Sequence, residues 1–398
     1  MNILFLTLHD FSSINEKGIY TDLLREFNKE KHNVYIISPT ERRNRQKTHL
    51  IDFDKGKILK IKIGNIQKSN LIEKGITTIT LESKFKKAIK KYFSDVKFDL
   101  IIYSTPPITL QKSVEYVKNR DNATTYLLLK DIFPQNAIDL NIFSKKGLIY
   151  KYFRNKEKQL YKLSDKIGCM SQANVDYLLN HNPWLDKKKV EVCPNSIDVQ
   201  DFNVTQLERI ALRNKYGIPL EKKVFVYGGN LGKPQGVDFL IKCLSSQVSN
   251  EKAFFLIVGA GTEYWKLEKY LNEDKPSNVK LMKHLPRDEY DCMIASCDVG
   301  MIFLDHRFTI PNFPSRLLTY MQAKLPVLSV TDSNTDIGRI IVSGDFGWSC
   351  ESNDVNMFKC TVYDILNANI TDMGAKGFEY LLQNYTVEKS CNIVKKHF

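Results

Sequence analysis

Short apolar segments of strand length recur along the whole chain, and stretches with helical periodicity separate them. They lie at residues 2–8, 34–38, 98–104, 124–129 and 166–170 in the first half and at 224–227, 254–258, 279–282, 299–303 and 327–330 in the second. After the first segment, Ile19, Leu23 and Phe27 recur every fourth residue, the spacing of one buried helix face. This alternation is typical of a mainly parallel sheet covered on both faces.

The alternation occurs twice, so we expect an α/β protein with two doubly wound, Rossmann-like domains. The 398 residues are enough for two hydrophobic cores. We place the first domain at residues 1–198 and the second domain at 199–385. Ligands bind beyond the carboxyl ends of strands in such sheets, so we expect the active site in a cleft between the domains.

The charge is unevenly distributed. The chain has 58 Lys and Arg against 45 Asp and Glu. Residues 1–195 hold 35 basic and 21 acidic side chains, whereas residues 196–398 hold 23 and 24. Within the first half, residues 41–97 alone hold 16 basic and 6 acidic. The excess indicates an anionic partner for the first domain, which could be nucleic acid, a membrane surface or a phosphorylated acceptor. The alternative is a lysine-rich chain with solvated faces.

Two patterns stand out in this basic segment. Residues 59–63 (LKIKI) alternate apolar and basic side chains, as in a half-exposed strand. Residues 84–93 predict a helix with Phe85 and Ile89 on one face and with four lysines around the rest, namely Lys84, Lys87, Lys90 and Lys91. Such a helix can lie on an anionic membrane surface or on an acceptor. It can equally pack on its own sheet with its lysines in water.

Several classes of protein are disfavoured by the sequence. No apolar run approaches the ~20 residues that span a bilayer, and residues 1–5 lack a basic leader. The eight cysteines form no CxxC pair and no metal-ligand spacing with histidine. We therefore expect a cytoplasmic protein with free thiols and no bound metal.

Four motifs together resemble one family. They are VCPNSID at 192–198, GGNLGKPQGVD at 228–238, PSRLLTYMQAKLPV at 314–327 and KDIFPQNA at 130–137. In this order they resemble the hinge, glycine loop and donor-site helix of GT-B fold glycosyltransferases. The fourth is similar to a stretch in transferases of bacterial capsule and O-antigen synthesis, including those for N-acetylfucosamine-type sugars. The resemblance implies the GT-B fold, with the second domain holding the donor and the first the acceptor. It also implies a C-terminal helix at 386–398 that crosses back to the first domain.

The resemblance assigns the donor site to the second domain. A nucleotide sugar loses a diphosphate, which GT-B enzymes usually stabilise without a metal or other cofactor, through helix N-termini and cations. Pro314 would preset the first helical turn, Ser315 would supply a capping hydroxyl, and the Arg316 guanidinium would bind phosphate. The alternative for Arg316 is a surface arginine in a first turn.

Glycines and a lysine complete the expected diphosphate contacts. Gly228 and Gly229 would let the backbone approach a phosphate, and Lys233 would reach the diphosphate. By resemblance, Gly18 in the first domain heads the helix whose loop faces the donor phosphate and the acceptor. The alternatives are ordinary strand-to-helix turns and a solvated lysine.

The chain departs from the family at several positions. Most relatives have two glutamates with seven residues between them, for the sugar and the ribose, and this chain has Pro311 and Thr319 there. The usual Arg and Lys of the glycine loop are Asn230 and Gln235. We interpret these changes as specialisation of the donor contacts, with Thr319 and Asn230 still lining the site. Uracil would be bound by the backbone of the loop at 283–287, around Leu285.

Asp131 and His9 are the catalytic candidates. Each follows a predicted strand, so each should lie at the carboxyl edge of the first sheet. A carboxylate there can accept the proton of an acceptor hydroxyl or contact the donor sugar. The alternatives are a helix N-cap for Asp131 and a structural role for His9.

The motifs and the charge lead to one hypothesis. We expect a metal-independent and retaining glycosyltransferase that moves an N-acetylated amino- or deoxysugar from a UDP-sugar to a polyprenyl-diphosphate-linked acceptor. It would lie at the inner face of the cell membrane and serve capsule or O-antigen synthesis. The alternatives are a UDP-sugar 2-epimerase of the same fold and a non-catalytic protein that binds anions or nucleic acid. We expect no nucleic acid, because the basic segment lacks aromatic-rich RNA-binding signatures.

Overall fold

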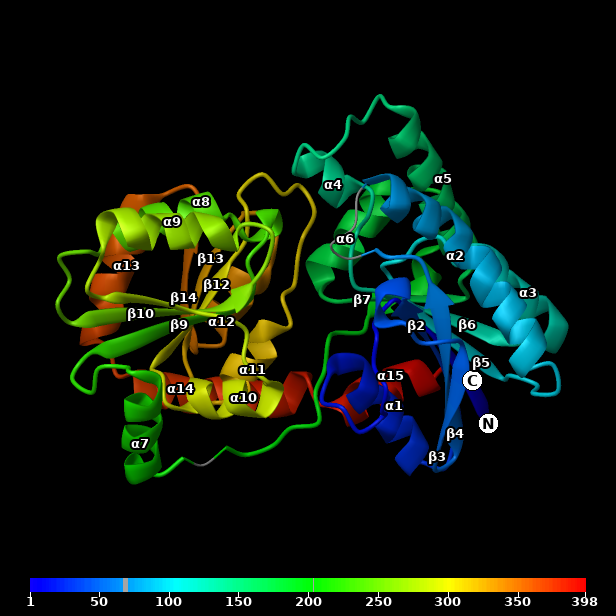
Figure 1. The fold of residues 1–398 in the computed structure, drawn as a ribbon, viewed down its shortest axis with the longest axis horizontal. Helices are drawn as coiled ribbons and strands as arrows, with labels where there is room; N and C mark the ends of the chain where they lie inside the picture. Colours follow the sequence, from blue (N-terminus) through cyan, green and yellow to red (C-terminus); the bar gives the residue numbers. More distant parts are fainter. Residues whose placement is uncertain (67–70, 203) are drawn as a thin grey trace. The chain divides into compact units, whose positions relative to one another are not determined.

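The computed structural model describes residues 1–66, 71–202 and 204–398 and divides them into two compact units. Unit 1 comprises residues 1–198 together with 387–398, and unit 2 comprises residues 199–386. Each unit is built around its own sheet (Figure 1). Both are Rossmann-like α/β domains, as the alternation of strands and helices predicts.

The sheet of unit 1 has eight strands in its described part, in the order β3-β4-β2-β1-β5-β6-β7-β8. All neighbouring pairs are parallel except β3 with β4. Their bounds are β1 (Asn2–Leu6), β2 (Asn33–Glu41), β3 (His49–Phe53), β4 (Gly56–Ile63), β5 (Leu100–Ser104), β6 (Thr124–Leu129), β7 (Lys166–Cys169) and β8 (Val190–Val192).

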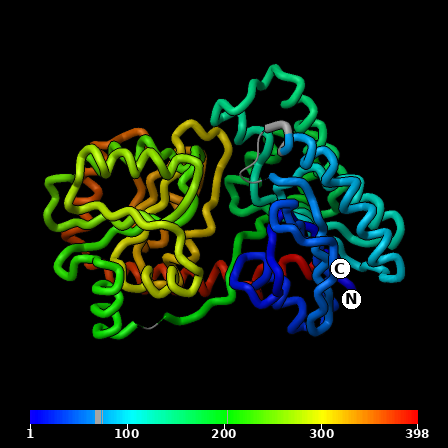
Figure 2. The backbone as a smooth tube through the Cα atoms, in the orientation of Figure 1, coloured from blue at the N-terminus to red at the C-terminus, as the bar shows by residue number. Residues whose placement is uncertain are grey.

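Helices cover both faces of this sheet. They are α1 (Ile19–Lys29), α2 (Leu71–Tyr92), α3 (Gln111–Asp121), α4 (Gln135–Asp139), α5 (Leu148–Leu163), α6 (Gln172–His181) and α15 (Val387–Lys395), with two 3-10 turns, η1 (Arg42–Asn44) and η2 (Lys187–Lys189). Phe27 of α1 and Val394 of α15 share one core with β1 and β5. Figure 2 shows the C-terminal helix beside α1, where Lys395 pairs with Glu30 at 2.5 Å. The C-terminal segment therefore completes the core of unit 1.

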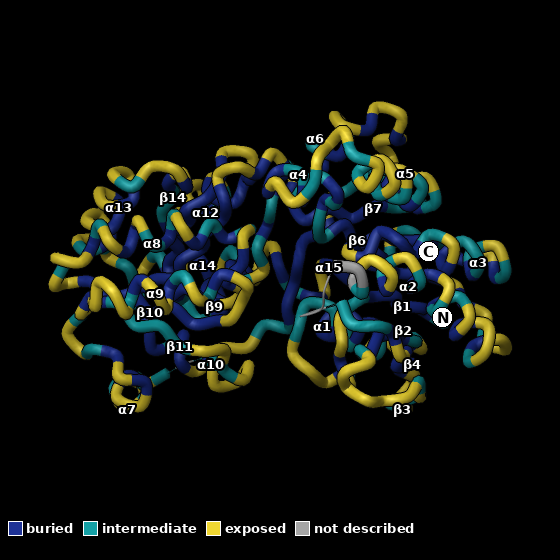
Figure 3. Tube along the Cα trace, turned by 45° about the horizontal axis from the view of Figure 1, so that its top comes forward, coloured by how far each residue is buried: buried dark blue, intermediate teal, exposed yellow. Residues whose placement is uncertain are grey.

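The sheet of unit 2 has six strands in its described part, all parallel, in the order β11-β10-β9-β12-β13-β14. The strands are β9 (Lys223–Asn230), β10 (Ala253–Ala260), β11 (Val279–Met282), β12 (Val299–Phe303), β13 (Val327–Thr331) and β14 (Gly347–Glu351). Most have no exposed residue in their middle, as dark blue in Figure 3 shows. This two-sided burial explains their continuous apolar runs.

The helices of unit 2 also lie on both faces. They are α7 (Gln206–Tyr216), η3 (Lys233–Gln235), α8 (Val237–Ser245), α9 (Tyr264–Asp274), α10 (Arg287–Ala295), α11 (Arg316–Gln322), α12 (Ile337–Ser343), α13 (Val355–Asn367) and α14 (Ile370–Asn384). Leu240, Leu267 and Phe358 bring α8, α9 and α13 together on one face, and α11 packs against α14 on the other (Figure 1). None of the described helices is long and apolar enough to cross a bilayer. All eight cysteines are free thiols.

Candidate functional site

The side chain of Arg316, the first residue of α11, lies among tyrosines. Its guanidinium carbon is 4.5 Å from the centre of the Tyr227 ring, which belongs to β9. Its Nη1 is buried and has no hydrogen-bond partner. In the described part of the chain, no carboxylate forms an ion pair with it. A half-buried guanidinium with one unpaired, buried nitrogen and no acidic partner is costly by itself and suits a bound anion.

Two further tyrosines complete these surroundings. Tyr320 lies one turn along α11, where its hydroxyl accepts from the Gly228 N–H and donates to the carbonyl of Met301, both at 3.1 Å. Burial raises the pKa of Tyr320 to about 12 and raises the pKa values of Tyr227 and Tyr290 as well. At neutral pH the phenols are therefore uncharged, and the charge of Arg316 is not neutralised.

The two glycines of β9 have different roles. A Cβ atom on Gly228 would lie 1.5 Å from the hydroxyl oxygen of Tyr290, so the missing side chain makes room for this ring. The approach of a phosphate to the backbone of Gly228 stays a prediction. Gly229 has a positive φ of 123°, which favours glycine, and a Cβ there would lie 3.7 Å from the guanidinium of Arg316. Gly229 is thus the glycine beside Arg316.

The residues before Arg316 only partly match the expected helix start. Ser315 occupies the N-cap position of α11, but its hydroxyl makes no capping hydrogen bond, so that prediction is wrong. The reason is its backbone, which is already helical at φ −64° and ψ −14°, whereas a capping residue is usually extended. Pro314 precedes it outside the helix.

The glycine loop is held by its own amide side chains. Asn230 Nδ2 donates to Gln235 Oε1 at 2.8 Å, and the Gly232 N–H donates to the same oxygen at 3.2 Å. Lys233, at the start of η3, is exposed. The two residues that replace the family's Arg and Lys therefore pair with each other, and Lys233 is the cation that this loop leaves in solvent.

Thr319 contacts Arg287, which was not predicted as a site residue. Arg287 Nη2 donates to Thr319 Oγ1 at 3.1 Å, and Arg287 Nε donates to Asp291 at 3.1 Å. Leu285, two residues before Arg287, is half-buried. At the position where relatives have the second glutamate, this chain thus has a hydroxyl bound to a guanidinium. The sequence signal for Arg287 was its place in the loop that we expected to bind the base.

In unit 1, Asp131 follows β6 at the carboxyl edge of the sheet. Both oxygens of its carboxylate accept from Asn136 Nδ2, at 2.8 and 2.9 Å. Burial raises the pKa of Asp131 to about 6. The helix that follows is α4, and its N-cap residue is Pro134, so the alternative of an N-cap aspartate is wrong. Asp131 is a carboxyl group that can change its charge near neutral pH.

Tyr20 connects the surroundings of Asp131 and His9. The ring centres of His9 and Tyr20 are 6.3 Å apart, and His9 also lies 5.6 Å from Phe11. Burial raises the pKa of Tyr20 to about 12; a hydrogen bond with Ser104 opposes the shift and the charge of Asp131 adds to it. Partial desolvation lowers the pKa of His9. Tyr20 was not predicted as a site residue, because it follows Ile19 within the periodic pattern of α1.

Gly18 immediately precedes α1, as expected. Its N–H donates to Asp22 Oδ1 at 3.1 Å, and the same carboxylate pairs with Arg25 at 2.5 Å. The φ of Gly18 is 171°, extended backbone that any residue adopts. The amide expected to face a phosphate is thus bound to a carboxylate of its own helix.

Lys60 corrects the prediction of a half-exposed strand at residues 59–63. Its side chain is 1% exposed, and it forms an ion pair with Asp10. It also donates to the carbonyl of Phe11 at 3.1 Å and to Ser38 Oγ at 3.2 Å. An alternating pattern does not distinguish a lysine in water from a buried lysine that reaches a carboxylate partner. Lys60 fixes the loop that follows β1 and carries His9.

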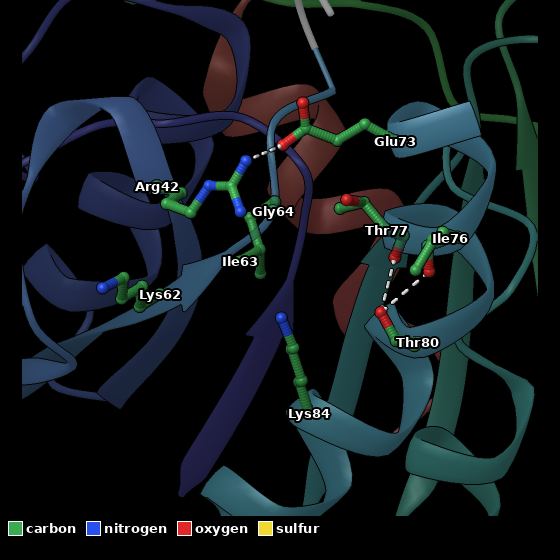
Figure 4. A pocket seen from close by; sticks show the side chains of 9 residues that line it. All are labelled: Arg42, Lys62, Ile63, Gly64, Glu73, Ile76, Thr77, Thr80 and Lys84. Atoms are coloured by element: carbon green, nitrogen blue, oxygen red, sulfur yellow. Dashed lines mark hydrogen bonds and ion pairs between the residues drawn. The ribbon is translucent and has the colours of Figure 1, made fainter. Parts of the chain in front are cut away.

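The lysines of α2 are divided between a pocket and the solvent. Lys84 lines the pocket in Figure 4, whereas Lys87, Lys90 and Lys91 are exposed. The apolar face of this part of α2 is buried within unit 1; it consists of Phe85 and Ile89, and Phe93 directly after the helix is buried as well. This stretch of α2 therefore packs on its own unit, which was the alternative to a helix that lies on a membrane or an acceptor. No cluster of three or more His, Cys, Asp or Glu that could hold a metal occurs in the ranges described above.

Residues 208–376, which lie in unit 2, match the family model "Glycosyl transferases group 1". The chain is 24% identical over 329 residues to the probable glycosyltransferase WbjE of Pseudomonas aeruginosa, covering 80% of this chain and 78% of the relative. It is also 24% identical over 254 residues to WcaI of Escherichia coli K12, a putative colanic acid biosynthesis glycosyl transferase, covering 61% and 60%.

Solved structures share the fold. Sucrose-phosphate synthase from Thermosynechococcus elongatus has a TM-score of 0.78 at 14% identity, covering 99% of this chain and 97% of that one. HepE of Anabaena, solved with UDP-glucose, has a TM-score of 0.70 at 14% identity, covering 100% and 99%. The predicted GT-B fold is confirmed. The cleft between the domains stays a prediction.

Proposed function

We propose, from the match of residues 208–376 to the group 1 glycosyltransferase model and from the similarity to WbjE, that this chain moves a sugar from a UDP-sugar to a polyprenyl-diphosphate-linked acceptor. The relative WcaI is named for the biosynthesis of colanic acid, which is a bacterial polysaccharide. The structural neighbour HepE was solved with UDP-glucose. Both names support a nucleotide-sugar donor and a role in polysaccharide synthesis.

The observation that carries the donor half of the proposal is the half-buried guanidinium of Arg316 beside Gly229, whose Nη1 is buried without a partner and which, among the described residues, has no acidic residue paired with it. When the sugar leaves UDP, the bond between its anomeric carbon and the diphosphate oxygen breaks, and negative charge grows on the diphosphate. A guanidinium that is already desolvated stabilises this charge without having to shed water. We assign the β-phosphate to Arg316 and the outer diphosphate oxygens to Lys233. No metal or other cofactor takes part in this proposal.

The acceptor half rests on Asp131. Its pKa of about 6 leaves the carboxylate mostly charged at neutral pH, yet basic enough to take a proton from the attacking hydroxyl. His9 and Tyr20 lie at the same edge of the sheet and would orient the acceptor. Because both family glutamates are absent, other groups must contact the sugar and the ribose, and we assign the ribose contact to Thr319 and Arg287. We propose an N-acetylated amino- or deoxysugar as donor, and retention of configuration.

A donor panel tests the proposal. Purified protein is incubated with UDP-linked hexoses, N-acetylhexosamines and N-acetylated deoxysugars, together with a lipid-linked monosaccharide diphosphate, and the products are analysed by mass spectrometry and by NMR of the anomeric proton. Transfer from at least one UDP-sugar, with the anomeric configuration retained, supports the proposal. No transfer and no donor hydrolysis with any of them contradicts it.

A further inference from the structure

The first half of α5 exposes apolar side chains instead of packing on unit 1. Leu148 is 83% exposed and Ile149 is 58% exposed. The buried residues of this helix, Glu157, Leu160 and Tyr161, all lie in its second half. Figure 3 shows the chain between α4 and the start of α5 largely in yellow, as exposed. These apolar residues lie outside the core, and exposed apolar residues of this kind indicate a binding partner.

The first half of α2 shows the same feature, and an ion pair links the two helices. Ile76 and Ile79 are 59% and 62% exposed. Both helices lead into parallel strands, β5 and β7, so both begin at the carboxyl edge of the sheet. Lys156 of α5 pairs with Glu82 of α2 at 3.3 Å. Ile79 lies about one turn before Glu82, and Tyr152 lies about one turn before Lys156, so the exposed residues of both helices are at the same edge.

The charge around the exposed residues of α5 has one sign. Residues 141–156 contain five basic and no acidic side chains. Large apolar and aromatic residues among lysines are characteristic of helices that lie in the interface of an anionic bilayer. A second copy of the chain would bring two cationic faces together, and a nucleic acid would leave the leucine and isoleucines in water.

A basic pocket adjoins the exposed residues of α2. Its volume is about 620 Å³, and Figure 4 shows Ile76 and Lys84 on one wall with Arg42 and Lys62 opposite. One carboxylate, Glu73, pairs with Arg42 at 2.8 Å. Three cations against one carboxylate leave an excess of positive charge that suits a phosphate group. Ile76 belongs both to the pocket and to the exposed apolar residues, so the two features are continuous.

We propose that an anionic lipid bilayer docks on this face, which we call the α2–α5 face and define by Ile76, Ile79, Leu148, Ile149 and Tyr152. The apolar side chains enter the interface, and the pocket of Arg42, Lys62 and Lys84 takes a headgroup phosphate. The inference rests on the proposed function, because a lipid-linked acceptor would then arrive at the edge of the sheet that carries Asp131. It shares Lys84 with the sequence prediction but does not use the other three lysines of that prediction, namely Lys87, Lys90 and Lys91.

Vesicle flotation tests the apolar part. The protein should float with phosphatidylglycerol vesicles and much less with phosphatidylcholine vesicles. The double change Leu148→Ser and Ile149→Ser should lower binding about tenfold or more, because two inserted side chains are lost. The matched control is Leu207→Ser in α7, where the leucine is 80% exposed and lies in unit 2. Unchanged binding of the double variant, or an equal loss with Leu207→Ser, would overturn the docking face.

Two double lysine substitutions test the pocket. The double variant Lys62→Gln with Lys84→Gln should bind phosphatidylglycerol vesicles more weakly than the double variant Lys90→Gln with Lys91→Gln, although both remove two charges. Each lost contact in the pocket should lower the vesicle affinity about fivefold. Equal losses would overturn the headgroup pocket. Sedimentation velocity without vesicles tests the other possible occupant, a second copy of the chain. A dimer that dissociates in the double variant Leu148→Ser with Ile149→Ser would assign the face to that second copy.

The two proposals fail separately. Vesicle binding without any sugar transfer would contradict the proposed function and support the docking face. Transfer to a water-soluble acceptor without vesicle binding by the wild-type chain would do the reverse. Melting curves and UDP binding of each variant show that the chain remains folded.

Discussion

The guanidinium carbon of Arg316 lies 4.5 Å from the centre of the Tyr227 ring, while its Nη1 is buried without a hydrogen-bond partner. An aromatic face attracts the cation but leaves the N–H donors at its edge unsatisfied. Phosphate oxygens are acceptors that fit these donors. The geometry thus explains why a cation is stable in the first turn of α11, where a charge of this sign is otherwise mildly unfavourable.

The pH dependence of transfer should report on Asp131. Because burial raises the pKa of this carboxyl to about 6, its charged form increases as the pH rises through that value. The rate at limiting substrate should therefore rise about tenfold per pH unit below 6 and level off above it. Asp131→Asn should lower the rate by about 100-fold or more and abolish this limb. The measurement is a radiolabel transfer assay from pH 4.5 to 8.

Stability provides the control for this variant. A carboxyl whose pKa is higher in the folded than in the unfolded state favours folding at low pH, and that contribution is lost as the pH rises through about 6. At pH 7, Asp131→Asn should consequently keep or raise the melting temperature. Asp176→Asn, at an exposed carboxylate of α6, should change neither the rate nor its pH profile. An unchanged profile in Asp131→Asn would exclude Asp131 as the proton acceptor.

Gly228 should be intolerant of any side chain. Gly228→Ala would place a methyl group 1.5 Å from the Tyr290 hydroxyl, and this overpacking should lower the free energy of unfolding by about 1–3 kcal/mol. Gly75→Ala is the matched control in α2, because nothing lies within 4 Å of a Cβ there. It should raise the free energy of unfolding by about 0.5–1 kcal/mol. Urea denaturation measures both, and equal effects would contradict the packing described for Tyr290.

Lys60 should contribute to stability although it is charged. Lys60→Met leaves Asp10 without its partner and leaves the Phe11 carbonyl with one donor fewer, and it should lower the free energy of unfolding by about 2 kcal/mol. This is below the usual cost of breaking a buried pair, because the carboxylate of Asp10 is partly exposed. Lys62→Met, at an exposed lysine of the same strand, should change it by less than about 0.5 kcal/mol. Similar losses in both variants would refute the special role of Lys60.

The buried strands were predictable because apolar periodicity follows directly from burial. Residues 124–129, 279–282 and 299–303 were predicted with the bounds that the structure has. Strands β3, β8 and β14 were missed, because β3 and β8 contain polar, partly exposed residues and β14 (GWSCE) has no aliphatic run. Edge strands with one or both faces in contact with solvent do not give the continuous signal of a central strand.

The site was only partly predictable, because pairing between distant residues leaves no local pattern. Arg316 was chosen from its place in a motif, but its tyrosine neighbours come from β9, α10 and its own helix. Tyr290 and Gly228 are 62 positions apart, and each is ordinary in its own segment. The contact between Arg287 and Thr319 likewise depends on the approach of two helices. Motifs can therefore locate the carboxyl edges of the sheets, while the partners of each side chain require the fold.

The most direct test is calorimetric titration of UDP and of uridine into the wild type, Arg316→Met and Arg339→Met. Arg339, in α12, is an exposed arginine of the same unit and controls for the loss of one charge. If Arg316 binds the diphosphate, Arg316→Met should weaken UDP binding by about 10- to 100-fold, the worth of a charge-assisted hydrogen bond, and leave uridine binding and Arg339→Met unchanged. Undiminished UDP affinity in Arg316→Met, or an equal loss for uridine, would contradict the account.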